Sequence, residues 1–113
     1  AVALLNEAKV LAHPASIDNV PTDGGKEDHV SMGMTSATKL RTVVKLAEMT
    51  TAIELMTAAQ ALDYRAPLTP GRGVKQAYDL VRGLVPSLTV DRATSKDIEE
   101  LTSAIRRGVF DEL

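Results

Sequence analysis

The sequence has no cysteine and no tryptophan, and its aromatic residues are limited to one phenylalanine and two tyrosines. Without cysteine, a disulfide framework and thiolate chemistry are excluded within this chain. A cysteine-free sequence is compatible with the cytoplasmic location that we predict. Because aromatic side chains are scarce, we expect the hydrophobic core to consist of Ala, Leu, Val, Ile and Met, a mixture that favours helices.

An excess of positive charge is also missing, since the formal net charge at pH 7 is −2. Proteins that bind nucleic acid normally present a basic surface, and binders of single strands add aromatic side chains on which bases stack. We therefore predict no nucleic-acid partner. No apolar stretch approaches the roughly 18 residues that a membrane-spanning helix requires, so no membrane partner is predicted either.

The first residues, AVALLNEAKVLA, carry Glu7 and Lys9 inside their apolar run. This pattern does not fit a signal peptide, which has a basic leader before an uninterrupted apolar core. The sequence also begins without methionine. We expect a chain that has been trimmed or that begins inside a larger element.

Proline and glycine divide the chain into helical stretches, and no alternating strand pattern is found. Apolar residues at helical spacing predict helices over residues 2–11, 30–64 and 72–85 and a short final helix after Thr94. The loop over residues 14–29 is rich in turn-forming residues. These residues are Pro14, Ser16, Asp18, Asn19, Pro21, Thr22, Asp23, Gly24 and Gly25. For the final helix, Thr94 is the expected N-cap, with Asp97 three residues later as in a capping box, and Gly108 is the expected stop.

The helix predicted over residues 30–64 would be about 35 residues long, and its second half is apolar. Residues 49–62 carry one charge, on Glu54. A helix that is apolar nearly all round is buried on nearly all sides, and the rest of this chain is too short to cover it. We therefore predict an all-α fold in which residues 1–113 form a single segment of a larger, mainly helical oligomer. The long helix would be central in a helical bundle, two shorter helices would follow it, and residues 49–62 would mediate self-association.

A charged cluster at the end of the loop is the sharpest chemical feature of the sequence. It consists of Asp23, Lys26, Glu27, Asp28 and His29. One interpretation is structural, because acids are stabilised near a helix N-terminus and Asp28 or Ser31 could cap the following helix. The other is functional, with Glu27 facing a substrate as a proton carrier or an amine-binding carboxylate. We predict no metal site, because adjacent residues rarely point at one ion and the spacing matches no zinc pattern.

The order of several motifs resembles that of the bacterial histidine ammonia-lyases, members of the aromatic amino acid ammonia-lyase family. The segment at residues 11–16 is similar to their LAHPAS, residues 17–22 resemble VDSIPTS, and residues 27–33 resemble the EDHVSMG of their QEDHVSMG. The segment at residues 59–68 is similar to AAQGLDFRxPL, at the end of the family's long helix. The resemblance spans nearly the whole chain, in order and with compatible spacing.

This resemblance implies the C-terminal part of a homotetrameric, mostly helical enzyme that releases ammonia from an amino acid without oxidation. The family's electrophile is a methylidene-imidazolone group formed from an internal Ala-Ser-Gly. This chain contains no Ala-Ser-Gly, so the resemblance implies no cofactor formed within it. The catalytic tyrosine of the family would also lie upstream.

The resemblance assigns a role to one position. Glu27 matches the glutamate that lines the active site in histidine-specific members, whereas phenylalanine and tyrosine lyases generally have glutamine there. A carboxylate pairs with an imidazole or an ammonium group better than an amide does. We therefore predict Glu27 as a catalytic and substrate-binding residue, with L-histidine converted to urocanate and ammonia.

Lys26 departs from the family pattern, which usually has glutamine at this position. A cation beside Glu27 favours the ionised carboxylate and could pair with it or contact the substrate. Two hypotheses follow. The first is the C-terminal part of an ammonia-lyase, inactive alone, whose partners are further copies or the missing N-terminal part. The second is a non-catalytic helical assembly module or a degenerate lyase paralogue.

Overall fold

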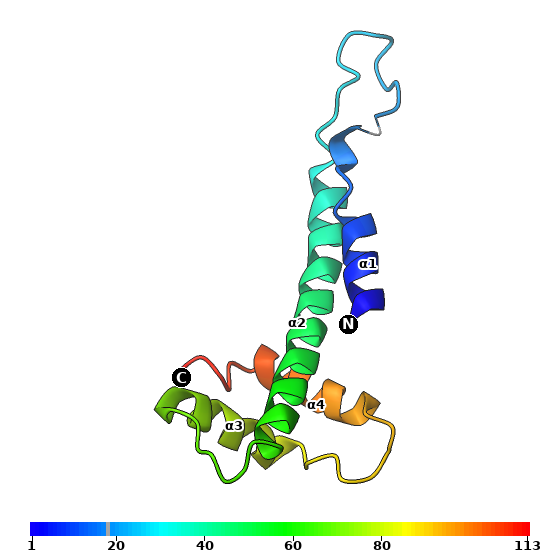
Figure 1. Cartoon of the computed structure of the whole chain (residues 1–113). Helices are drawn as coiled ribbons and strands as arrows, with labels where there is room; N and C mark the ends of the chain where they lie inside the picture. The colour runs from blue at the N-terminus through cyan, green and yellow to red at the C-terminus, as the bar shows by residue number, and fades with distance from the viewer. Residues whose placement is uncertain (18) are drawn as a thin grey trace. The chain divides into compact units, whose positions relative to one another are not determined.

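The computed structural model describes residues 1–17 and 19–113, and every regular element in them is helical. Figure 1 shows the elements in chain order, which are α1 (Val2–Leu11), the short 3₁₀ helix η1 (Ala15–Ile17), α2 (Gly33–Asp63), α3 (Arg72–Leu84) and α4 (Ser95–Arg106). The all-α prediction is confirmed. Asp18, expected to form a turn in the loop, lies outside the described residues.

Contacts within the chain fall into two compact units, residues 2–47 and residues 48–113, with Ala1 grouped with the second. The boundary lies within α2. The prediction that residues 1–113 form a single segment of a larger domain stays a prediction.

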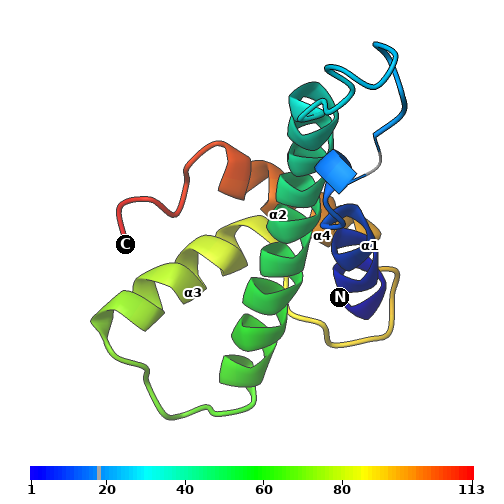
Figure 2. The same ribbon diagram turned by 90° about the horizontal axis from the view of Figure 1, so that it is seen from above.

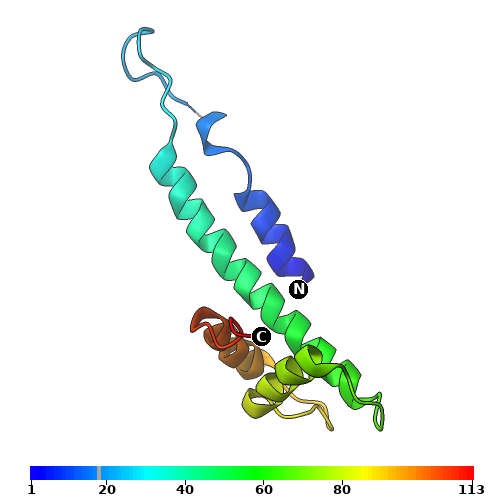
Figure 3. The same ribbon diagram turned by 90° about the vertical axis from the view of Figure 1, so that its left-hand side faces the viewer.

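In the unit of residues 2–47, α1 runs alongside the first half of α2 (Figure 3). The Lys39 ammonium group donates a hydrogen bond to the carbonyl oxygen of His13, which ties the end of α1 to α2. Pro14 follows His13 and prevents α1 from continuing. Ala15 and Leu46 are the buried apolar side chains of this unit.

The long helix begins at Gly33, three residues later than the sequence pattern predicted. Met32 has φ of 53°, in the left-handed region, so the helix cannot extend through it toward the N-terminus. The carbonyl oxygen of Met32 accepts the first helical hydrogen bond, from the Ser36 amide at 2.9 Å. The predicted capping role of Asp28 is wrong, because its carboxylate accepts hydrogen bonds from loop amides instead.

In the unit of residues 48–113, the core joins α2, α3 and α4. Its fully buried members are Ala52, Ala59, Val81, Val85 and Leu101. Ala52 and Ala59 are seven residues apart and so lie on one face of α2, where their small side chains let the neighbouring helices approach closely. Figure 2 shows the loop that joins α2 to α3 and the connection that joins α3 to α4.

The expectation that this chain cannot cover residues 49–62 is wrong for one face of α2. Ala52 and Ala59 are 0% and 3% exposed within the core of the unit, and Leu55 and Met56 are partly buried against it. The opposite side of the same stretch, which includes Glu54, stays exposed.

The last helix begins and ends where the sequence predicted, but its N-terminus lacks the expected side-chain capping bonds. Gly108 has φ of 74°, and the Val109 amide donates to the Ala104 carbonyl oxygen at 3.1 Å, the bond of a Schellman stop. At the other end, Thr94 occupies the N-cap position without a side-chain capping bond. Asp97 forms an ion pair with Arg92 at 2.5 Å, so the predicted capping box is wrong.

Among the described residues, no helix combines the length and apolar character needed to cross a membrane.

Candidate functional site

The loop that contains Lys26 and Glu27 is held together by the carboxylate of Asp28. Its Oδ1 atom accepts hydrogen bonds from the backbone amides of Thr22, at 2.6 Å, and of Asp23. Its Oδ2 atom accepts one from the amide of Gly25 at 2.6 Å. The bonds from the Asp23 and Thr22 amides lower the pKa of Asp28 below its ordinary value, because they stabilise the charged form.

Two further contacts fix the shape of this loop. Asn19 accepts a hydrogen bond from the Val30 amide through Oδ1, at 2.5 Å, and donates one to the Ser16 carbonyl oxygen through Nδ2. Between them, Gly24 and Gly25 adopt φ angles of 58° and 85°, which glycine reaches without a steric penalty. These glycines therefore form the turn of the loop.

Glu27 lies between two anchored residues, and its exposed carboxylate is not among the groups that form the hydrogen bonds described for this loop. The Lys26 amide donates to the Asp23 carbonyl oxygen at 3.1 Å, and Asp28 follows Glu27 directly. Both Lys26 and Glu27 are exposed. Their side chains form no ion pair with each other in the part of the chain that the structure describes. The catalytic and substrate-binding roles of Glu27 and the substrate-binding role of Lys26 stay predictions.

His29 is also exposed on this loop. Within residues 1–17 and 19–113, no three His, Asp or Glu side chains gather closely enough to hold a metal ion.

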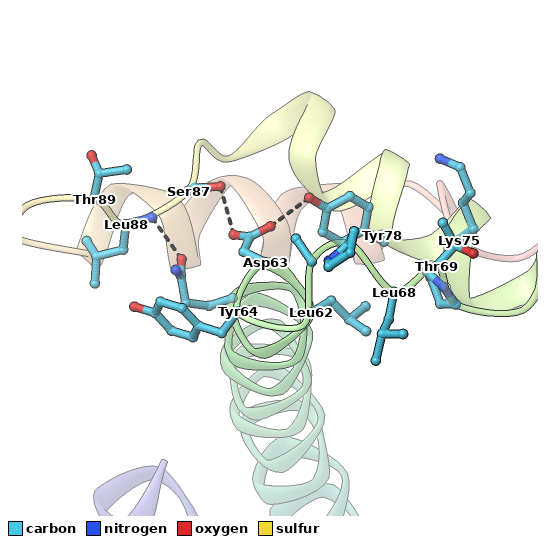
Figure 4. A pocket seen from close by; sticks show the side chains of 14 residues that line it. Leu62, Asp63, Tyr64, Leu68, Thr69, Lys75, Tyr78, Ser87, Leu88 and Thr89 are labelled. Atoms are coloured by element: carbon cyan, nitrogen blue, oxygen red, sulfur yellow. Dashed lines mark hydrogen bonds between the residues drawn. The ribbon is translucent and has the colours of Figure 1, made fainter.

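A second polar site, which the sequence motifs did not reveal, lies at the end of α2. It is a cavity of about 700 Å³ formed by the last turn of α2, the loop after it, α3 and residues 87–89 (Figure 4). Its lining side chains include Asp63, Tyr64, Lys75, Tyr78 and Ser87.

Asp63 is the centre of this second site. Its Oδ1 accepts a hydrogen bond from the Tyr78 hydroxyl at 2.6 Å, and its Oδ2 accepts bonds from Arg82 at 2.7 Å and from the Ser87 hydroxyl at 2.8 Å. Figure 4 shows Tyr78 and Ser87 directed at Asp63 from different segments. Burial opposes the charge on Asp63, yet the bonds from Tyr78, Ser87 and Arg82 outweigh it and hold the pKa of Asp63 below its ordinary value.

Tyr78 and Gln60 extend the network. The hydrogen bond to Asp63, with burial as a second cause, raises the pKa of Tyr78, since a charged phenolate would face the carboxylate. The Gln60 side-chain oxygen accepts a bond from the Leu88 amide at 2.8 Å and lies 3.4 Å from a nitrogen of Arg82. The Asp63 oxygens are therefore engaged by internal donors, which suits a structural clamp rather than a reacting group.

The clamp consists of Gln60, Asp63, Tyr78, Arg82 and Ser87. Some of these residues indicate a buried polar site from their positions in the sequence alone. Gln60 and Asp63 interrupt the apolar second half of the long helix, and Arg82 interrupts the apolar face of α3. Residues that break an apolar face in this way are buried only where partners satisfy them.

Comparisons with known proteins match most of the chain. A model of the aromatic amino acid lyase family matches residues 1–83. The histidine ammonia-lyase of Myxococcus xanthus is 51% identical over 106 residues, which are 94% of this chain and 21% of that protein. The chain thus spans about one fifth of the length of the curated relatives it matches.

Solved structures agree with this match. The crystal structure of histidine ammonia-lyase from Trypanosoma cruzi superimposes with a TM-score of 0.92 at 40% identity, covering 98% of this chain and 22% of that one. Tyrosine aminomutase from Streptomyces globisporus superimposes with a TM-score of 0.86 at 39% identity, covering 98% of this chain and 21% of that one.

Proposed function

Because this chain belongs to the aromatic amino acid lyase family, we propose that it forms the C-terminal part of an ammonia-lyase that converts L-histidine to urocanate and ammonia. The observation that carries the proposal is the 51% identity to a histidine ammonia-lyase over 94% of the chain. The substrate preference is supported by the carboxylate of Glu27, at the position where lyases of other aromatic amino acids generally carry an amide.

The surroundings of Glu27 support a role toward a substrate outside this chain. Its side chain is exposed, and it takes no part in the hydrogen bonds that hold the loop. An ionised carboxylate in this position can accept hydrogen bonds from an imidazole or ammonium group and can exchange a proton with it. Lys26 is next to it and is proposed to contribute to the charge of the same surface.

The family's methylidene-imidazolone group supplies the electrophile when it is present. It forms from an Ala-Ser-Gly, and this chain contains none. The residues here therefore do not build that group, and their proposed contribution is to bind and orient the substrate. On this basis we expect the 113-residue chain to be inactive alone.

Measuring urocanate formation from L-histidine by its ultraviolet absorbance tests the proposal. The purified 113-residue chain should show no turnover above background, whereas a complete lyase that contains this segment should be active. In that complete enzyme, Glu27→Gln should reduce kcat/KM for histidine at least about 10-fold, since a charged hydrogen bond is replaced by a neutral one. Unchanged kinetics in Glu27→Gln would contradict the role of Glu27.

A second candidate function, a helical assembly module without catalysis, is favoured by exposed apolar side chains. Val2, Leu5, Val10, Met34, Leu40 and Val44 are each between 48% and 82% exposed. Together with the exposed side of residues 49–62, they would be covered by further copies of the chain or by a separate N-terminal part. A strictly monomeric species in light scattering at high concentration would count against self-association.

A cytoplasmic location belongs to the same proposal, and fractionation of cells that express the protein would test it.

A further inference from the structure

The bonds of the loop converge on the residue directly after Glu27. Asp28 is half-buried, and its carboxylate bridges three backbone amides that lie three to six residues earlier in the chain. From this geometry we propose that Asp28 is a positioning residue for Glu27, which fixes the backbone on which the Glu27 carboxylate is presented to substrate. This inference rests on the proposed function of Glu27.

The backbone on the other side of Glu27 is fixed as well. The Lys26 amide closes a turn on the Asp23 carbonyl oxygen at 3.1 Å. Asp23 in turn donates its own amide to Asp28. Glu27 therefore lies between two residues, Lys26 and Asp28, that are both hydrogen-bonded to Asp23.

An aspartate suits this role better than an asparagine. An ionised carboxylate only accepts hydrogen bonds, so both of its oxygens can face amide hydrogens. In Asp28→Asn the side-chain NH₂ group would replace one oxygen and confront either the Gly25 amide or those of Thr22 and Asp23. One set of bonds would be lost, and two donors would face each other.

The need for positioning follows from the loop itself. Between η1 and α2 the described residues contain no regular element, and a segment without one loses its shape unless side chains hold it. A misplacement of about 1 Å at a substrate-facing group can cost on the order of 100-fold in rate. The hydrogen bonds to Asp28 order the segment before substrate arrives. The loss of conformational entropy therefore occurs on folding and does not weaken substrate binding.

A double-mutant cycle in a complete lyase that contains this segment tests the inference. The variants are Glu27→Gln, Asp28→Ala, Asp28→Asn and the double variant Glu27→Gln/Asp28→Ala. Asp23→Asn is the matched control, because it removes the same charge from the same loop while the Asp23 amide stays in place. Circular dichroism and the imidazolone absorbance verify that each variant is folded and carries its electrophile.

We expect Asp28→Ala to lower kcat/KM for histidine about 10- to 100-fold, Asp28→Asn to lower it less, and Asp23→Asn to leave it unchanged. The double variant should be no worse than Glu27→Gln alone, because a residue that acts through Glu27 has nothing left to position. A purely structural role for Asp28 would instead multiply the two losses.

The outcomes separate the two claims. Wild-type kinetics in Asp28→Ala, or multiplicative losses in the double variant, would overturn the positioning role while an impaired Glu27→Gln keeps the proposed function. Wild-type kinetics in Glu27→Gln would overturn the proposed function itself. If Asp28→Ala does not fold, the same cycle with Asp28→Asn decides between additive and non-additive losses.

Discussion

The Tyr78 hydroxyl donates a hydrogen bond of 2.6 Å to the carboxylate of Asp63, the last residue of α2. The same carboxylate accepts bonds from Arg82 in α3 and from Ser87 in the following connection. One side chain thus joins α2 to α3 and to the connection after α3, through three partners that are 15 to 24 residues away from it in sequence.

Replacing Asp63 should therefore loosen the unit of residues 48–113. Asp63→Asn keeps the shape of the side chain, but an NH₂ group replaces one of the two carboxylate oxygens. The hydrogens of this group then face the hydrogens of Tyr78, or those of Arg82 and Ser87. We expect the free energy of unfolding in urea to fall by roughly 1–3 kcal/mol, the usual cost of leaving partly buried polar groups unpaired. Asp79→Asn is the control, since Asp79 pairs with Lys75 at an exposed position and should lose less than about 0.5 kcal/mol.

The stabilisation by Asp63 should also depend on pH. Its pKa is lower in the folded chain than in the unfolded one, so below the unfolded value of about 3.9 the unfolded chain binds a proton that the folded chain does not. The contribution of Asp63 is therefore fully present above that pH and is lost as the pH falls through the folded pKa.

Urea titrations at several pH values measure this effect directly. The difference in unfolding free energy between the wild-type chain and Asp63→Asn should be constant from pH 7 to about pH 5 and should shrink below about pH 4. A difference that grows on acidification would contradict the direction of the pKa shift.

Leu101 on α4 offers a test of the core. It is fully buried among Ala52, Ala59, Val81 and Val85. Leu101→Ala removes buried methyl groups and leaves a cavity, so the unfolding free energy should fall by about 2–4 kcal/mol. Leu113→Ala makes the same chemical change at a side chain that is 53% exposed and should change stability by less than about 0.5 kcal/mol. Equal losses in the two variants would show that α4 does not pack as described.

Much of the helical architecture could be predicted because it depends on local signals. The ends of the helices were predicted to within a few residues from the periodic apolar residues, from Pro14 and from Gly108. The start of α2 was missed because it depends on the left-handed conformation of Met32, which a non-glycine residue rarely adopts and which no pattern announces.

The errors at polar residues share one physical cause. Asp28 and Asp97 both stand where a helix cap is plausible, but the partners that they bind are loop amides and Arg92. Which donors an acidic side chain binds depends on where the folded backbone places them. Sequence spacing alone therefore does not predict its partners. The Asp63 clamp depends on partners in α3 and beyond, and for that reason the sequence motifs indicated Glu27 but not this second site.

The stop of α4 provides a final prediction, in which two glycines respond in opposite directions to the same substitution. Gly108 has φ of 74°, and a Cβ atom there would lie 2.6 Å from the Asp111 carboxylate. Gly83 lies inside α3 without a positive φ, and a Cβ atom there would meet nothing within 4 Å. Gly108→Ala should destabilise the chain by about 1 kcal/mol or more because an L-residue is strained in the left-handed region. Gly83→Ala should stabilise it by roughly 0.5–1 kcal/mol because alanine loses less backbone entropy in a helix. Urea unfolding of both variants checks the pair, and a gain in stability from Gly108→Ala would mean that α4 does not end in the Schellman stop.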